Sequence, residues 1–134
     1  MKFYTYEEYE CMDMSISVEE MSRLHREMLM EIGDDECALE LYEELIKKVN
    51  KYSTFRADWW VWSREERMEK DSSRTICHEA VIVKFNQLAR YLKQQKKTAT
   101  WREVLGDEKE HLYNRKRIGD FACYIFFVNG LCAR

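Results

Sequence analysis

The sequence has no proline and only four glycines in 134 residues. Proline and glycine shape tight turns, so their scarcity argues against an all-β protein and favours helices joined by short loops. The chain also lacks any run of about eighteen apolar residues, so we expect no membrane-spanning helix. Hydrophobic residues nevertheless make up 46% of the chain, which is enough for a packed core and argues against wholesale disorder.

Familiar catalytic and metal-binding patterns are missing as well. There is no glycine-rich phosphate loop, no His-Glu-x-x-His and no Gly-x-Ser-x-Gly. The three histidines are widely separated and the five cysteines form no Cys-x-x-Cys pair, so we expect no metal and no cofactor. We therefore expect the cysteines to be reduced thiols, as is usual in cytoplasmic proteins. Together with an N-terminus that lacks the pattern of a secretory signal, they favour a cytoplasmic location.

The charge of the chain is unevenly distributed. Residues 1–73 carry 10 Lys or Arg against 19 Asp or Glu, whereas residues 74–134 carry 12 against 6. This asymmetry predicts either two oppositely charged surfaces or acidic and basic helices that pack side by side.

Apolar residues recur at intervals of three and four along most of the chain, which is the period of one helical face. We therefore predict a single all-α domain over residues 1–134, a bundle of about five main helices and one short helix. The main helices are expected near 18–33, 35–52, 55–70, 73–96 and 113–129, and the short one near 101–106. Residues 1–16, rich in tyrosine and glutamate, are predicted to form an N-terminal arm.

Several residues are suited to begin or end these helices. A serine or threonine three residues before a glutamate is a capping-box pattern, and it occurs at Ser17–Glu20 and Thr100–Glu103. Ser72 and Ser73 are good N-cap residues for the central helix. Gly33 is placed to end the first helix.

Four polar residues lie in one row of the central helix, at multiples of four residues: Arg74, His78, Asn86 and Arg90. Side chains at this spacing are neighbours, so the row predicts either bridges to adjacent helices or a shared polar pocket. In an enzyme, the histidine would transfer a proton, the arginines would hold a phosphate or carboxylate, and the asparagine would orient the imidazole. The bridging interpretation is the one that we favour.

Three of the four tryptophans, Trp59, Trp60 and Trp62, stand within four residues of each other. With Phe55, the first and last of them are spaced for one face of the helix predicted over 55–70. We favour a role in the core with one ring at its edge. The alternative is an exposed aromatic surface for a protein partner, because tryptophan is enriched at interfaces.

The Arg74-x-x-x-His78 motif resembles the Arg-then-His motif of the HEPN class of helical ribonucleases. In that family both residues lie on one helix and act on the 2′-hydroxyl and phosphate of RNA across a dimer. The usual gap in the family is four to six residues, and here it is three. The resemblance implies an RNA-cleaving role for these two residues.

A broader set of residues is shared with another family. Ser73-Arg74, His78-Glu79-Ala80, Thr100-Trp101-Arg102 and Arg117-x-x-Asp120-Phe121-Ala122 resemble a family of small uncharacterised helical bacterial proteins over about residues 72–134. This resemblance implies a helical fold and a cytoplasmic location, and no activity.

We expect a non-enzymatic cytoplasmic bacterial protein that acts by binding protein, including a second copy of itself. The alternative is a nucleic-acid-binding protein or a HEPN-like ribonuclease. Nucleic acid would be bound through the basic half of the chain, where positive side chains can follow a phosphate backbone: Lys93, Lys96, Lys97, Arg102, Arg115, Lys116 and Arg117.

Overall fold

The computed structural model describes residues 15–59, 61–105 and 112–129. Within these residues the chain forms five α-helices and no strand. They are α2 (Val18–Ile32), α3 (Glu36–Trp59), α4 (Arg64–Gln94), α5 (Thr100–Val104) and α6 (Leu112–Val128). The prediction of an all-α fold is confirmed. The predicted N-terminal arm lies almost entirely outside the described residues.

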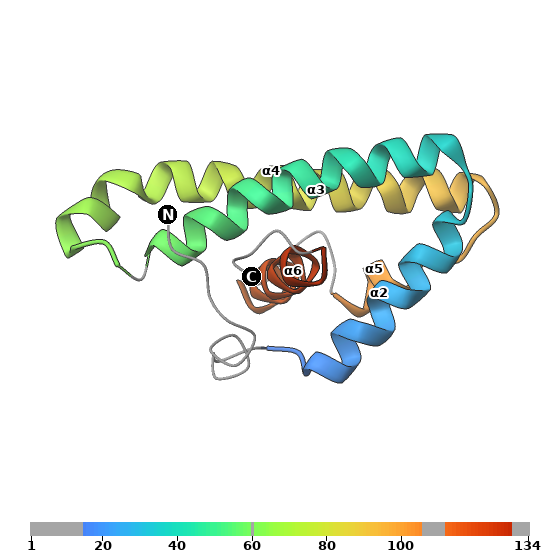
Figure 1. The fold of residues 1–134 in the computed structure, drawn as a ribbon, viewed down its shortest axis with the longest axis horizontal. Coiled ribbons are helices and arrows are strands. Elements are labelled where there is room, and N and C mark those ends of the chain that lie inside the picture. The colour runs from blue at the N-terminus through green and yellow to red at the C-terminus, as the bar shows by residue number, and fades with distance from the viewer. Residues whose placement is uncertain (1–14, 60, 106–111, 130–134) are drawn as a thin grey trace.

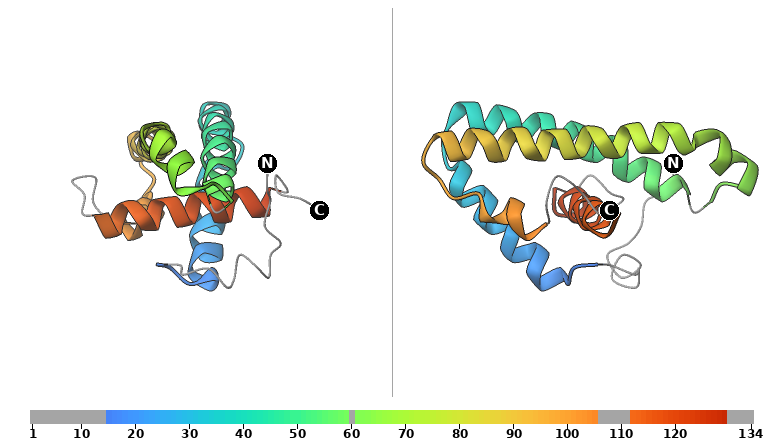
Figure 2. Two further views of the ribbon diagram at one scale, coloured as in Figure 1. Left: turned by 90° about the vertical axis from the view of Figure 1, so that its left-hand side faces the viewer. Right: turned by 180° about the vertical axis from the view of Figure 1, so that it is seen from behind.

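Two long antiparallel helices, α3 and α4, run the length of the molecule (Figure 1). The last helix, α6, crosses beneath both of them (Figure 2). α2 and α5 lie together at the end where α3 begins and α4 finishes. The opposite end of the hairpin, where α3 passes into α4, therefore extends beyond the part of the fold that α2 and α5 cover.

Hydrogen bonds confirm the predicted start and end of the first helix and the predicted start of the second. The Ser17 hydroxyl accepts a hydrogen bond from the Glu20 N–H, as an N-cap should. Gly33 ends α2 with a φ of 52°, a left-handed value that glycine adopts without strain. The Asp35 carboxylate accepts hydrogen bonds from the backbone N–H groups of Cys37 and Ala38, and so caps α3.

The separate helix predicted over 55–70 is wrong. α3 continues without a break to Trp59, because nothing between residues 52 and 55 interrupts a helix. The chain then reverses, and α4 begins after a full capping box in which Ser63 and Glu66 bond each other's backbone N–H groups at 3.2 Å. Ser72 and Ser73 consequently lie inside α4, exposed, and cap nothing.

The capping box predicted at Thr100–Glu103 is also wrong. The N-cap residue of α5 is Ala99, and no side chain caps it. The Glu31 carboxylate on α2 instead accepts hydrogen bonds from the Ala99 N–H and from Nε1 of Trp101, both at 3.1 Å. A partner distant in sequence thus satisfies the polar groups that a local cap would otherwise have satisfied.

The core lies where α6 passes under α3 and α4. Phe85 of α4 and Phe121 of α6 stack with ring centroids 5.7 Å apart, and Trp101 of α5 packs beside them. Each of these side chains is fully buried, and burial of such a group contributes about 1.5–3 kcal/mol. α6 meets α3 closely at Gly119, where a Cβ atom would lie 2.5 Å from the Tyr52 hydroxyl.

Candidate functional site

A cleft of about 670 Å³ opens between the end of α3, the first half of α4 and the start of α6. Its lining is rich in arginine and aromatic side chains. The lining residues are Tyr52, Arg56 and Trp59 of α3, Arg67, Arg74, Thr75 and His78 of α4, and Arg115 and Lys116 of α6.

Helical spacing explains how α3 and α4 present these side chains to the cleft. Arg67, Arg74 and His78 stand at intervals of seven and four residues, which places them on one face of α4. Tyr52, Arg56 and Trp59 are likewise separated by four and three residues on α3. The antiparallel hairpin turns these two faces towards each other, so the site is assembled from residues that only the continuous α3 and α4 bring together.

The cleft is strongly positive. Four arginines and a lysine line it, and no aspartate or glutamate is among the described residues that do so. The nearest acidic partners lie behind two of the arginines: Asp120 bonds Arg56 at 2.6 Å, and Glu79 is paired with Arg115. Two of the five cations are thus paired with a carboxylate outside the lining. Cations still outnumber these carboxylates, and the excess of positive charge in the cleft attracts an anion.

Arg56 is held in place from below. The Asp120 carboxylate is completely buried, and its second oxygen accepts hydrogen bonds from the backbone N–H and the hydroxyl of Ser15, at 2.8 and 2.7 Å. Burial by itself would lower the pKa of Arg56, but the neighbouring Cys123, Tyr52 and Asp120 outweigh it, and its pKa is raised. Arg56 therefore remains charged and oriented at the floor of the cleft.

Two further arginines gather around Trp59. The Arg74 guanidinium lies over the indole ring, 4.9 Å from its centroid, and that of Arg67 lies 5.9 Å away. Arg67 also donates a hydrogen bond from Nε to the Trp59 carbonyl at 2.7 Å. Neither guanidinium forms an ion pair with a carboxylate in the described part of the chain, so both can donate from their terminal NH₂ groups to an anion.

His78 is neutral in this setting. Burial lowers its pKa to about 4, and the positive charges of Arg115, Arg74 and Arg56 act in the same direction. Its Nε2 lies 2.9 Å from the Arg115 carbonyl, and because a carbonyl can only accept, the proton of the neutral ring is on Nε2. The ring stacks on Tyr52 at 5.1 Å, which fixes its orientation and leaves Nδ1 as a hydrogen-bond acceptor.

The polar row predicted on the central helix divides into two parts. Arg74 and His78 line the cleft together. Asn86 is two turns further on, about 12 Å along the axis, where its buried side chain accepts a hydrogen bond from Nε of Arg102 at 2.6 Å. Arg90 is exposed beside it, with Nε 3.4 Å from the Asn86 carbonyl. Only the first half of the row thus belongs to the cleft.

The tryptophans predicted as an interface are found at the tip of the hairpin. Trp59 and Trp62 are both half-buried, with ring centroids 6.3 Å apart in an edge-to-face arrangement. Trp62 also packs edge-on against Phe55 at 5.1 Å. Trp60 lies outside the described residues.

The basic residues predicted to bind nucleic acid are scattered. Arg115 and Lys116 line the cleft, and Arg117 beside them is half-buried. The others lie around α5: Lys93 pairs with Glu103 at 3.6 Å, Lys97 bonds the Glu31 carbonyl, Lys96 is exposed and Arg102 is buried. The predicted set therefore forms no single surface.

Four residues of the cleft were not predicted from the sequence: Tyr52, Arg56, Arg67 and Thr75. The seven-residue interval between Arg67 and Arg74 was a usable signal, but it is hidden when a helix boundary is placed at residues 70–73. Arg56 had no such signal, because α4 and α6 bring it into the cleft.

No three or more His, Cys, Asp or Glu side chains of the described residues are arranged to hold a metal ion. In those same parts of the chain, every helix is too short or too polar to cross a lipid bilayer. No protein-family model, curated protein or solved structure matches this sequence. The interpretation of the cleft therefore depends on its own geometry.

Proposed function

We propose that this protein binds a ligand carrying phosphate groups in the cleft between α3, α4 and α6. The observation that supports this most is the set of four arginines and one lysine around a single opening whose described lining has no carboxylate. A ligand with a single carboxylate group would need only one of these cations. Five cations suit a ligand with several negative charges close together, as in a pyrophosphate or a phosphodiester chain.

The state of His78 supports binding more than catalysis. A histidine with a pKa of about 4 is a weak base at neutral pH, whereas efficient general bases have a pKa near the working pH. A neutral imidazole adds a hydrogen-bonding group to the cleft. The ribonuclease alternative, with Arg74 and His78 in catalytic roles, is therefore the second candidate.

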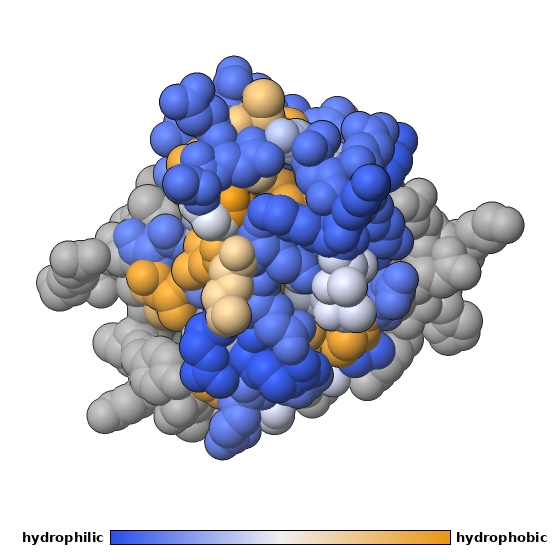
Figure 3. Space-filling model, turned by 90° about the vertical axis from the view of Figure 1, so that its right-hand side faces the viewer, coloured by the Kyte–Doolittle hydropathy of each residue, from blue (hydrophilic) through white to orange (hydrophobic). Residues whose placement is uncertain are grey.

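Protein binding through the tryptophans stays a prediction. Figure 3 shows the end of the molecule opposite the tryptophans, where α3 begins and α4 finishes, and there the surface is mostly hydrophilic with hydrophobic areas interrupted by charged side chains. Large unbroken apolar patches are the usual mark of a docking surface. The half-buried rings at the hairpin tip also line clefts rather than a flat apolar face, so they favour a small or elongated charged ligand.

Arg74→Gln is the most direct test of phosphate binding. Arg74 is exposed and lies on the Trp59 ring, so its replacement should change the charge of the cleft with little effect on folding. We expect calorimetric titration with inorganic pyrophosphate to show affinity at least about tenfold weaker for the variant, because a hydrogen bond to a charged group contributes about 1.5–3 kcal/mol.

Arg26→Gln is the matched control, since Arg26 is an exposed arginine of α2 that does not line the cleft. It should bind pyrophosphate as the unaltered protein does. Equal affinity of all three proteins, or no binding by any of them, would contradict the proposal. To test the second candidate, RNA incubated with purified protein should remain intact.

A further inference from the structure

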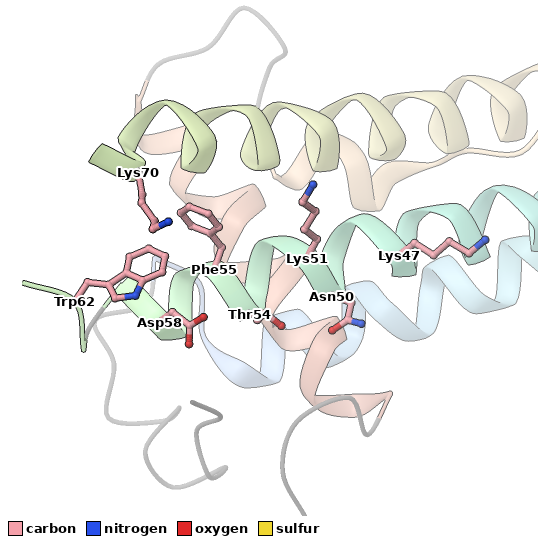
Figure 4. A pocket seen from close by; sticks show the side chains of 8 residues that line it. All are labelled: Lys47, Asn50, Lys51, Thr54, Phe55, Asp58, Trp62 and Lys70. Atoms are coloured by element: carbon pink, nitrogen blue, oxygen red, sulfur yellow. The ribbon is translucent and has the colours of Figure 1, made fainter. Parts of the chain in front are cut away.

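A second groove lies on the other side of α3. It has a volume of about 410 Å³ and contains three lysines, Lys47, Lys51 and Lys70, with Phe55 and Trp62 at its end. Figure 4 shows Lys70 reaching from α4 towards the two aromatic rings, with Lys51 and Lys47 further along α3. Within the described residues, none of these lysines forms an ion pair with a carboxylate.

The groove and the cleft meet at a pair of aromatic rings. Trp59 lines the cleft and Trp62 lines the groove, and their ring centroids are 6.3 Å apart. Each ring carries cations on its own side: Arg74 and Arg67 over Trp59, and Lys70 over Trp62 at 5.5 Å. Positive side chains therefore lie on both sides of the ring pair at the end of the hairpin, and one carboxylate, that of Asp58, also lines the groove.

We propose that the ligand is a single-stranded nucleic acid, which passes from the cleft over Trp59 and Trp62 into the groove along α3. This inference depends on the proposed function, because the cleft is its first binding site. Proteins that hold single strands combine a positive path for the phosphates with aromatic rings on which bases stack. A mononucleotide would fill the cleft alone and leave the lysines of the groove unused.

The spacing of the lysines fits an extended chain. Lys47 and Lys51 are one helical turn apart, about 6 Å along α3, and Phe55 follows one turn later. The groove also contains the polar side chains of Asn50 and Thr54, and Asp58 is the one carboxylate among its described lining residues. The acidic residues of the first turns of α4, Glu65, Glu66 and Glu69, line neither opening.

Length dependence is the first test of this inference. Fluorescence anisotropy would be measured with labelled oligothymidylates of increasing length, with thymidine monophosphate and pyrophosphate as competitors. We expect affinity to rise by at least about tenfold between a mononucleotide and an oligomer of about eight nucleotides, because a longer strand reaches both openings. Affinity that does not change with length would overturn the inference and leave phosphate binding in the cleft intact.

The double variant Lys47→Gln/Lys51→Gln tests the path through the groove. Each phosphate contact adds about 0.7 to the slope of log affinity against log salt for a single strand, so the slope should fall by about 1.4. Pyrophosphate binding should not change, since neither lysine lines the cleft. The matched control is Arg26→Gln/Lys48→Gln, which removes two exposed positive charges elsewhere and should keep the original slope.

The role of the two tryptophan rings between the cleft and the groove is tested with Trp62→Leu. Loss of one stacked base should weaken oligomer binding by at least about fivefold and leave pyrophosphate binding unchanged. A thermal melt of each variant verifies that it is folded, and the lysine pair supplies an independent result if Trp62→Leu does not fold. Polyglutamate that binds as tightly as the oligomer would overturn the inference, because charge alone would then explain recognition. Failure of pyrophosphate to bind would instead contradict the proposed function itself.

Discussion

The two halves of α4 differ sharply although they belong to one continuous helix. From Cys77 onwards it contributes eight buried residues, among them Phe85 and Leu88, whereas none of the residues from Arg64 to Ile76 is buried. In the first half, Met68 is 72% exposed and Ile76 67% exposed. The second half stabilises the fold and the first half carries two of the four cleft arginines, Arg67 and Arg74, so these side chains can vary at little cost in stability.

Phe85→Ala should give the largest loss of stability. The ring is fully buried against Trp101 and Phe121, so its removal leaves a cavity and should lower the free energy of unfolding by about 3–5 kcal/mol. Met68→Ala, in the exposed half of the same helix, should change it by less than about 0.5 kcal/mol. Urea denaturation followed by circular dichroism measures both, and similar losses in the two variants would contradict the division of α4.

Gly119→Ala tests how closely the cleft depends on packing beneath it. The added Cβ would meet the Tyr52 hydroxyl at 2.5 Å and push α6 from α3, which should cost about 1–3 kcal/mol. Because Tyr52 stacks on His78, pyrophosphate affinity should fall too. Ala122→Gly, one turn further along α6 in the core, is a useful comparison: it should lower stability with a smaller effect on affinity. If Gly119→Ala melts at the same temperature as the unaltered protein, the Tyr52 side chain can move away from the added Cβ without cost, and the prediction is wrong.

Ser63→Ala tests where α4 begins. Loss of the cap should lower the free energy of unfolding by about 1 kcal/mol, because the Glu66 N–H loses its partner. Ser72→Ala should have no such cost, since Ser72 is exposed inside the helix and alanine is the better helix former. The opposite ranking of the two variants in urea denaturation would place the helix start at Ser72, as the sequence had indicated.

The smallest expected effect is a dependence of stability on pH that comes from His78. Its pKa is about 4 in the folded protein and about 6.5 when unfolded, so between these values the unfolded chain binds the additional proton. Stability should therefore fall as the pH drops from 6.5, by no more than about 1 kcal/mol by pH 5.5. His78→Gln should reduce this slope. Burial lowers the pKa of His25 as well, so His25→Gln is the parallel measurement. Identical slopes of stability against pH in the unaltered protein, His78→Gln and His25→Gln would contradict a role for either histidine.

Local signals predicted much of this fold. Ser17, Gly33 and Asp35 mark helix ends through contacts within a few residues, so the boundaries of α2 and the start of α3 follow from the sequence. The division near residues 52–55 and 70–73 failed because the serines at 72 and 73 resemble caps, whereas Ser63, which caps α4, precedes a run of charges without an apolar period. A solvated helical end lacks the hydrophobic signal by which helices are recognised.

The site was predictable only where its residues share a helix. Arg74 and His78 line one cleft, as their four-residue spacing suggests. Asn86 has the same spacing but lies under α5, where Arg102 engages it. The same helical row thus passes from the cleft into the region beneath α5, and only tertiary packing decides which part of the row faces a ligand.

The Asp120 carboxylate bonds segments of the chain that the ribosome synthesises at very different times. It bonds Ser15, which precedes it by 105 residues, and Arg56, which precedes it by 64. Contacts of such long sequence separation form late, because the loops that they close are large. On the ribosome, α3 and α4 emerge before α6, so a nascent chain can pair its long helices while Arg56 still lacks its partner. The arginine-lined cleft therefore takes its final form in one of the last steps of folding.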